Sequence, residues 1–168
     1  MSTITSPRRP SRTRRGETVE VPLTADGRAL LEQRLETLYV EALPDLRPLL
    51  VGRDRDERDV AAFERLVAEA QQLEAVLGCA VVATPSPDGA VVLGSRVLLR
   101  TPDGEGIWVR PVHPAEAALD DERISVASPL SRALLGRTTG DRVTVRGPAG
   151  DWVAEVLEVA WSTATPVR

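Results

Sequence analysis

Apolar residues recur at helical spacing in two stretches of the N-terminal half. Both stretches advance by three or four positions: Leu31, Leu35, Leu38, Ala42, Leu46 and Leu49, then Phe63, Leu66, Ala70, Leu73 and Leu77. This period places one apolar stripe along each helix. Two such helices can bury their stripes against each other, so the pattern predicts an antiparallel coiled-coil hairpin over residues 22–79.

The segment between the two stretches, residues 52–59, is charged and contains no apolar side chain. It cannot pack against a dry surface, so we expect it to form the tip or loop of the hairpin. Thr24 or Asp26 can cap the first helix. Pro44 and Pro48 predict a kink or a brief break in the first arm, because each proline lacks a backbone donor and crowds the preceding turn.

The hydrophobic period changes after Ala80. Valine-rich runs alternate with segments rich in Pro, Gly and Asp, which is typical of strands joined by turns. The expected strands cover residues 81–82, 91–100, 107–112, 142–146 and 152–161. One short helix interrupts them, with Ser128 as its cap and Pro129 at its first position. The predicted fold class is therefore α+β, with a small, mostly antiparallel β domain over residues 80–168 following the hairpin.

Composition narrows the class of protein. Aromatic residues make up 3% of the chain, so we expect an aliphatic core. No stretch approaches the roughly 20 apolar residues of a membrane span, and the N-terminus lacks the apolar segment of a secretory signal. The single cysteine, Cys79, argues against a disulfide scaffold. These features predict a cytoplasmic protein that does not enter a membrane.

Charge is distributed unevenly along the chain. All 21 basic residues are arginines, and five of them lie within the first sixteen positions. We expect residues 1–21 to form a disordered, Arg-rich tail, either solvated or in contact with a polyanion. The chain has a net charge of −4, so residues 17–168 carry −9. Because nucleic-acid binding needs a concentrated basic face, this body is expected to act on nucleic acid only through another protein.

The sequence of residues 124–145, ISVASPLSRALLGRTTGDRVTV, resembles a signature of the GreA/GreB family of bacterial transcript-cleavage factors. That signature reads like ISxxSPLxRALLGKxxGDxVxV. Three shorter segments resemble family motifs in the same order: residues 23–27 its opening LTxxG, residues 44–46 its RPEI, and residues 114–117 its EAD segment. The resemblance covers about residues 22–162.

The resemblance implies an N-terminal coiled-coil hairpin and a C-terminal FKBP-like β domain. In the family, the β domain docks at the rim of the secondary channel of RNA polymerase, and the hairpin is threaded inward. Acidic residues at the hairpin tip help to hold a second Mg²⁺ in the polymerase active site, where a hard cation prefers carboxylate oxygens. RNA polymerase would then be both partner and catalyst, and nascent RNA would be contacted only indirectly.

Two groups of site residues follow from the resemblance. The tip near the metal would present Asp54, Asp56, Glu57 and Asp59. The surface that binds polymerase would include Asp120, Asp121, Ser125, Ser128 and Pro129. The chain would not be an enzyme: it would be a monomer without catalytic residues or a cofactor of its own, and it would bind no metal stably when free. The Mg²⁺ would belong to the polymerase active site.

The tip departs from the family pattern, which resembles GDLSENAEY. If Asp56 and Asp59 take the two acidic positions and Phe63 the aromatic position, the leading Gly, the Leu and the Asn are missing. The hairpin is also about nine residues shorter than usual, which reduces its reach by about 7 Å at roughly 1.5 Å per helical residue. That pairing places most of the deletion in the second arm, whereas a symmetric hairpin would turn nearer residues 53–57.

These departures favour an inhibitor or modulator of elongation over a true transcript-cleavage stimulator, because some family members inhibit polymerase with an acid-rich tip. Without the resemblance, the mixed-charge run is typical of a solvated turn that needs no ligand. Two alternatives belong to another class. The FKBP-like fold allows a peptidyl-prolyl isomerase, although few aromatic residues could line its pocket, and the hairpin allows a non-catalytic adaptor.

Other conspicuous residues are expected to be structural. Cys79 is interpreted as a small buried hydrophobe. His113 stands alone, without the second His or spaced Cys that a zinc site needs. Trp108, Trp152 and Trp161 fall on expected strands, so we expect them to fill the β-domain core or, at a strand end, to join a protein interface.

Overall fold

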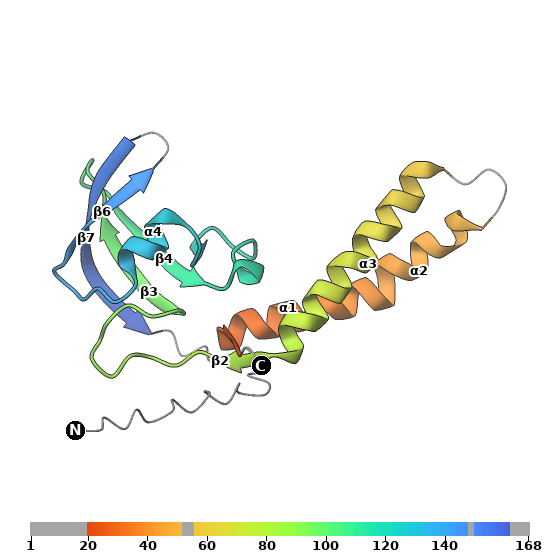
Figure 1. Cartoon of the computed structure of the whole chain (residues 1–168), viewed down its shortest axis with the longest axis horizontal. Helices are drawn as coiled ribbons and strands as arrows, with labels where there is room; N and C mark the ends of the chain where they lie inside the picture. The colour runs from red at the N-terminus through yellow and green to blue at the C-terminus, as the bar shows by residue number, and fades with distance from the viewer. Residues whose placement is uncertain (1–19, 52–55, 148–149, 162–168) are drawn as a thin grey trace, which may run out of the picture.

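The computed structural model describes residues 20–51, 56–147 and 150–161, and a two-helix hairpin projects from a β domain (Figure 1). The helical segments are α1 (Ala25–Thr37), the π-helical turn η1 (Leu38–Ala42), α2 (Leu43–Leu46), the 3₁₀ turn η2 (Arg47–Leu50), α3 (Glu57–Gly78), the 3₁₀ turn η3 (Pro114–Glu116) and α4 (Pro129–Leu134). The strands are β1 (Val21–Leu23), β2 (Ala80–Val82), β3 (Ser95–Arg100), β4 (Gly106–Val112), β5 (Arg123–Ser125), β6 (Arg142–Gly147) and β7 (Gly150–Trp161).

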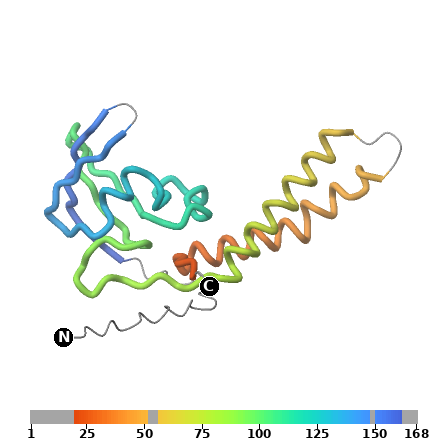
Figure 2. Tube along the Cα trace, viewed as in Figure 1, coloured from red at the N-terminus to blue at the C-terminus, as the bar shows by residue number. Residues whose placement is uncertain are grey.

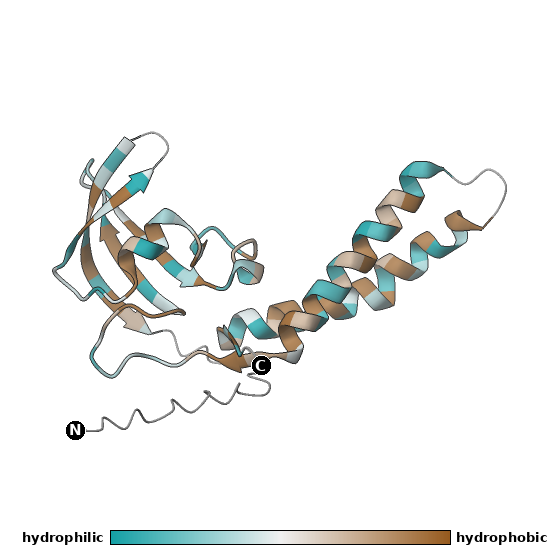
Figure 3. Ribbon diagram, viewed as in Figure 1, coloured by the Kyte–Doolittle hydropathy of each residue, from teal (hydrophilic) through white to brown (hydrophobic). Residues whose placement is uncertain are grey.

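The antiparallel hairpin predicted from the two apolar stripes is confirmed. Its arms run next to each other away from the β domain (Figure 2), and hydrophobic residues recur along both of them (Figure 3). The buried cluster between the arms and at their base contains Leu23, Leu31, Leu38, Ala70 and Leu73. A polar bond at the edge of the stripe links the arms as well, since Arg34 Nε donates to Glu69 Oε1 at 2.8 Å.

Hydroxyl side chains begin two of the helices. Of the two residues that could cap α1, Thr24 is the cap, because its Oγ1 accepts from the backbone N–H of Gly27 at 3.0 Å. Asp26 lies in the first turn instead. Ser128 caps α4 as predicted, and its Oγ accepts from the backbone N–H of Ser131 at 3.2 Å.

The first arm is interrupted, as its two prolines predict. The irregularity begins before Pro44, because the proline ring cannot donate and would crowd the carbonyl of Val40 one turn back. The chain widens into η1 there, and the N–H of Leu43 donates to the carbonyl of Leu38, five residues earlier. Around Pro48 the helix tightens into η2, and no further α-helix follows up to Val51, where the described part of this arm ends.

The β domain is a curled five-stranded sheet in the order β5-β4-β3-β7-β6, with α4 packed beside it (Figure 1). The sheet is mostly antiparallel, as expected, and the exception is β5, which pairs with β4 in parallel. The connection from β4 to β5 runs through η3 and a short loop, so the chain crosses over and enters β5 in the direction of β4. The sheet is therefore mixed.

The expected strand at residues 81–82 does not join this sheet. It belongs to β2, which pairs in parallel with β1 in a separate two-stranded sheet, where Leu23 lies opposite Val82. β1 was not predicted, because a three-residue strand shows no period of its own. This small sheet ties the start of the hairpin to its end.

The strand expected from residue 91 begins only at Ser95. Val91 is buried, but its backbone bonds to the loop after α4: its N–H donates to the carbonyl of Arg137 at 2.7 Å, and its carbonyl accepts from Gly136 at 2.8 Å. Gly94 has φ +90°, which turns the chain before β3 starts. Val91 therefore contributes to the core from a loop.

The β-domain core is aliphatic, as the composition predicts. Its buried members are Val91, Val97, Leu99, Val109, Leu134, Val143, Val145, Ala154 and Val156. The expectation that the tryptophans fill it is wrong: Arg96 covers the Trp108 ring at 4.3 Å, Trp152 packs at the core margin, and Trp161 approaches Gly94. A curled sheet closed by a six-residue helix encloses little volume, which the aliphatic side chains already occupy.

Two residues expected to be structural occupy element ends. Cys79 follows α3 and is half-buried rather than buried, because it lies where the helix leaves the hairpin core. His113 begins η3, and its Nδ1 accepts from the backbone N–H of Ala115 at 3.2 Å. Burial lowers the pKa of this imidazole. Within the ranges that the structure describes, no helix is long and apolar enough to cross a bilayer.

Candidate functional site

The hairpin tip carries its acids at the start of α3. Asp56 is the N-cap of this helix, and its Oδ1 accepts from the backbone N–H of Arg58 at 2.8 Å. Glu57 and Asp59 lie in the first helical turn, so these two acids of the expected tip or loop belong to the helical part of the tip. Carboxylates are favourable at the positive end of a helix, which explains why the helix begins here. Asp54 lies outside the described residues.

These carboxylates are far from the β domain and open to solvent. α3 has 22 residues, so at about 1.5 Å per residue its start lies about 33 Å from its end at the hairpin base (Figure 1). Asp56 and Glu57 are exposed, and Asp59 is half-buried. Their oxygens suit Mg²⁺, a hard cation. Within the described ranges, no three His, Cys, Asp or Glu side chains are grouped so that they could hold a metal ion.

The structure describes both arms up to the tip. The first arm remains helical to Leu50, Val51 is extended, and α3 starts at Glu57. Residues 52–55 lie outside the described ranges, so the position of the turn stays a prediction. Phe63 lies two helical turns inside α3, where it is half-buried.

The predicted polymerase-binding residues lie in one segment of the β domain, between η3 and α4. Asp120 is exposed, but its Oδ1 accepts from the backbone N–H groups of Glu122 at 3.1 Å and Arg123 at 3.0 Å. Its Oδ2 lies 2.9 Å from Arg123 Nη1. Asp120 therefore shapes the turn that leads into β5. Asp121, its neighbour, is exposed.

The two serines of this segment also bond to the backbone. Ser125 Oγ accepts from the N–H of Ala127 at 3.1 Å, and Ser128 caps α4. Both serines are half-buried, whereas Pro129 is exposed. The segment thus presents Asp121 and Pro129 to solvent on the β domain, away from the acidic tip.

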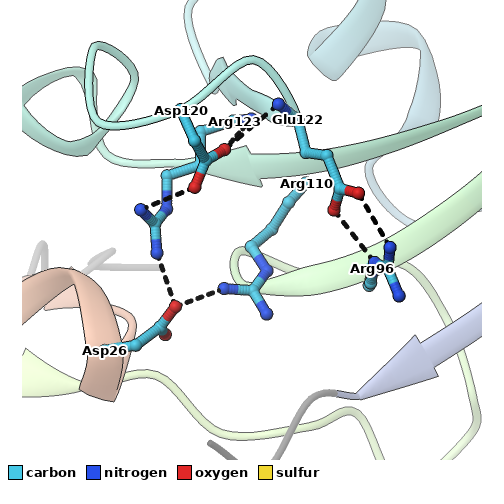
Figure 4. Close-up of a pocket in the computed structure, with 6 residues that line it drawn as sticks. All are labelled: Asp26, Arg96, Arg110, Asp120, Glu122 and Arg123. Atoms are coloured by element: carbon cyan, nitrogen blue, oxygen red, sulfur yellow. Dashed lines mark hydrogen bonds and ion pairs between the residues drawn. The ribbon is translucent and has the colours of Figure 1, made fainter.

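A polar junction joins the hairpin to the β domain (Figure 4). Asp26 Oδ2, from the first turn of α1, lies 2.7 Å from Arg110 Nη1 of β4 and 2.5 Å from Arg123 Nη2 of β5. Arg96 and Glu122 lie on the other side of this junction. Arg96 Nε donates to Glu122 Oε2 at 3.0 Å, and Arg96 Nη2 donates to Glu122 Oε1 at 2.7 Å. These side chains and Asp120 line a cleft of about 250 Å³.

A second contact of the junction is completely buried. Glu116 of η3 is 0% exposed, and its carboxylate accepts from the backbone N–H of Thr24 at 3.1 Å and from the Thr24 hydroxyl. A Cβ on Gly27 would lie 1.7 Å from Glu116 Oε2, so only glycine leaves room for this carboxylate. The β domain therefore supplies an acid to the N-terminus of α1, where its charge is favourable.

The two junction acids differ in how readily they ionise. Burial raises the pKa of Glu116, and the hydrogen bonds from Thr24 and the charge of Arg123 oppose this rise without cancelling it. Burial also acts to raise the pKa of Asp26, but the charge and hydrogen bond of Arg110 and the charge of Arg123 outweigh it. The pKa of Asp26 therefore lies below its ordinary value.

Comparison with known proteins gives the family. A model described as "Transcription elongation factor, GreA/GreB, C-term" matches residues 86–160. Over 153 residues the chain is 34% identical to transcription elongation factor GreA of Geobacillus kaustophilus, which covers 83% of this chain and 96% of that protein. The chain belongs to the GreA/GreB family. GreA of Alkalilimnicola ehrlichii is 31% identical over 156 residues, covering 85% of this chain and 99% of that relative.

Solved structures of GreA/GreB relatives match as well. GreA factor homolog 1 (Gfh1) of Thermus thermophilus is 32% identical and covers 83% of this chain and 98% of its own, with a TM-score of 0.38. The GreA/GreB factor of Nitrosomonas europaea is 25% identical and covers 84% of this chain and all of its own, with a TM-score of 0.40.

Family membership confirms the resemblance carried by residues 124–145. GreA/GreB factors are not catalytic themselves, and this agrees with the prediction that the chain is not an enzyme. The junction of this GreA/GreB chain was not found from its sequence. Two signals were present: Arg110 is a charged residue within an apolar strand, and Glu116 belongs to the segment that resembles the family's EAD motif.

Proposed function

We propose that this chain binds bacterial RNA polymerase at the secondary channel through its β domain and inhibits or modulates elongation with its acidic hairpin tip. The observation that carries the proposal is the position of Asp56, Glu57 and Asp59 at the far end of a finger about 33 Å long. Such a finger can bring carboxylates to a metal centre that a globular domain cannot enter. The family gives the partner, since its members are transcription elongation factors.

In this proposal the residues have separate tasks. Asp121 and Pro129 contact polymerase, and Asp120, Ser125 and Ser128 hold the loop that presents them. The tip acids, with Asp54 among them, approach the Mg²⁺ of the polymerase active site, a hard cation that binds carboxylate oxygens. The chain acts as a monomer in the cytoplasm, adds no cofactor of its own and meets nascent RNA only indirectly.

One observation favours the second candidate, stimulation of transcript cleavage. Asp56 and Asp59 are three residues apart at the start of α3, so their side chains lie on neighbouring positions of one helix face. A pair of carboxylates at this spacing could help to bind a second Mg²⁺ that activates water for attack on the RNA phosphodiester. The missing Asn and Gly of the family tip favour inhibition instead.

The length of RNA in stalled, backtracked elongation complexes separates these functions. We expect the wild-type chain to slow extension without shortening the transcript, and Asp56→Asn/Asp59→Asn to relieve the inhibition. Asparagine is chosen because it still caps a helix while the charge is lost. Glu64→Gln, an exposed acid further along α3, is the control and should inhibit like the wild type.

Other results of this experiment would support the alternative functions. Shortened transcripts that disappear with Asp56→Asn/Asp59→Asn would establish cleavage stimulation. If the chain neither binds polymerase nor changes RNA length, the proposal is wrong. A prolyl-peptide isomerisation assay would then separate an isomerase from a non-catalytic adaptor.

A further inference from the structure

The outer face of the first hairpin arm is open to solvent. Glu32, Glu36 and Val40 follow one another at a spacing of four residues, on the side of the helix that is turned away from the buried Leu31 and Leu38. Among the residues that the structure describes, the exposed large apolar side chains of the hairpin helices all lie on this arm: Leu30, Tyr39, Val40 and Leu49. The face is therefore an unpartnered surface of mixed acidic and apolar character.

The hairpin carries most of the negative charge of the chain. Residues 20–79 contain 13 acids and seven arginines, a net charge of −6, whereas residues 80–168 carry −2. On the first arm, Glu36, Glu41 and Asp45 are exposed, and no arginine among the described residues lies within 4.0 Å of their carboxylates. These carboxylates are thus available to a basic segment.

The chain itself contains such a segment. Residues 1–16 hold five arginines and no acid, so their charge of +5 comes close to balancing the −6 of the hairpin. These residues lie outside the described structure, which the chain enters at the base of the hairpin. There the N–H of Val21 donates to the carbonyl of Cys79 at 2.8 Å, and α1 begins four residues later at Ala25.

Chain length allows the basic segment to follow the first arm. Arg15 and Arg8 precede Glu20 by five and 12 residues, which span up to about 17 and 40 Å when extended. Glu36 and Asp45 lie 11 and 20 residues beyond the start of α1, which corresponds to about 17 and 30 Å along the arm. The arginines can therefore be distributed over the same length of arm as the acids.

We infer that the arginine-rich segment of residues 8–15 docks on the outer face of the first arm of its own chain. Its guanidinium groups bind Glu36, Glu41 and Asp45, and the ring of Tyr39, which is 48% exposed, offers them a stacking surface. Exposed ion pairs are individually weak, but the covalent link raises the effective concentration of the segment to about the millimolar range. A nucleic acid or a second copy of the chain is the less favoured occupant, because neither is held beside its binding partner.

Paramagnetic broadening in the full chain tests the inference without any partner. A nitroxide attached to Ser11→Cys, in a Cys79→Ala background, should broaden the amide signals of Glu36 and Val40 at ~0.01 M salt and leave that of Thr144 in the β domain unchanged. At ~1 M salt, where the Debye length is about 3 Å, the broadening should fall strongly. Unchanged signals of the first arm at low salt would overturn the inference.

A pair of double variants tests the acids of the face. We expect Glu36→Gln/Glu41→Gln to reduce the broadening at Val40 by about threefold or more. The matched control, Asp103→Asn/Glu105→Asn, removes the same charge from exposed acids of the turn between β3 and β4 and should reduce it much less. Equal losses for the two variants would leave only a general effect of charge and overturn the docking face.

Two further measurements test the other occupants. When the nitroxide-bearing chain is mixed with an isotope-labelled chain that carries no nitroxide, we expect no broadening, and broadening there would assign the contact to a second copy. A short DNA duplex that binds the basic segment while the first arm shows no broadening would assign the segment to an external polyanion. Either of these results would overturn the inference.

Docking on the first arm shields the finger that the proposed function sends into polymerase, and this consequence alone rests on that function. Replacing the five arginines by serine should strengthen the affinity for core RNA polymerase severalfold, whereas replacing them by lysine, which keeps the charge, should not. An unchanged or weaker affinity of the serine variant would contradict the shielding. Wild-type chain without affinity for polymerase would contradict the proposed function, and the broadening would still decide the contact.

Discussion

Gly27 lies where Glu116 of the β domain packs against the start of α1, and it leaves no room for a side chain. A methyl group there would overlap Glu116 Oε2 at 1.7 Å and Thr24 Oγ1 at 2.5 Å. We therefore expect Gly27→Ala to lower the free energy of unfolding by about 2 kcal/mol or more, because a buried carboxylate must be displaced. Thermal unfolding followed by circular dichroism measures this loss.

Gly78→Ala is the matched control for this substitution. Gly78 is the last residue of α3, and a Cβ there would meet no atom within 4 Å. The control should leave the melting temperature unchanged or raise it slightly, since alanine favours helix over glycine. Equal melting temperatures for Gly27→Ala and the wild type would contradict the close contact between Gly27 and Glu116.

Asp56 shows how one residue can have a structural and a functional explanation. Its carboxylate caps α3 through the N–H of Arg58, which requires no ligand. Only one of its oxygens makes this bond, so the other remains available to a metal. Because capping tolerates asparagine and metal binding needs the charge, Asp56→Asn separates the two roles and Asp56→Ala does not.

The junction between α1 and the sheet depends on the charge of Asp26. Its folded-state pKa lies below 3.8, so the ionised carboxylate stabilises the folded chain above that pH, and this contribution is lost as pH falls through the folded pKa. Asp26→Asn leaves Arg110 and Arg123 without their shared partner, and we expect it to cost about 2 kcal/mol near pH 7. Melting temperatures of both proteins from pH 7 to pH 3 measure the effect.

The difference between wild type and Asp26→Asn should narrow as the pH falls toward 3. Glu116 acts in the opposite direction: its pKa is raised, so its protonation stabilises the folded chain as the pH falls toward 4.5. Both proteins retain Glu116, so only the part of its contribution that depends on the charge of Asp26, which helps to raise the pKa of Glu116, differs between them. Asp45→Asn, at an exposed acid of α2, is the control. A difference that stays constant with pH would show that the charge of Asp26 is not what stabilises the junction.

Elements with their own period or cap could be predicted from the sequence. α3 repeats its apolar positions over several turns, and Ser128-Pro129 marks the start of α4 by local chemistry. β1 and β5 have three residues each and become strands only by pairing with distant partners. The tip acids could be proposed because they are neighbours in the sequence. The junction could not, because Asp26 contacts arginines that lie 84 and 97 positions away.

At the scale of the whole molecule, charge is separated along the long axis. The acids of the tip lie at the start of α3, at the far end of the hairpin, whereas α4 and β6 lie in the β domain (Figure 1). Residues 126–147, which include α4 and β6, contain four arginines and one acid. The buried contacts of Glu116 and Asp26 connect the two parts and hold the finger to its base. The acidic tip therefore lies at a fixed distance from the surface of any partner that binds the β domain.

Localised hydroxyl-radical cleavage tests most directly whether the acidic tip reaches the polymerase active site. An iron chelate attached to Glu57→Cys, in a Cys79→Ala background, should cut RNA polymerase beside its catalytic magnesium and cut the 3′ end of the nascent RNA. The same chelate at Gln71→Cys, 14 residues further along α3 and exposed, should cut only nearer the channel entrance. Cleavage from Glu57→Cys confined to the outer surface of polymerase, or identical patterns from both positions, would contradict the account.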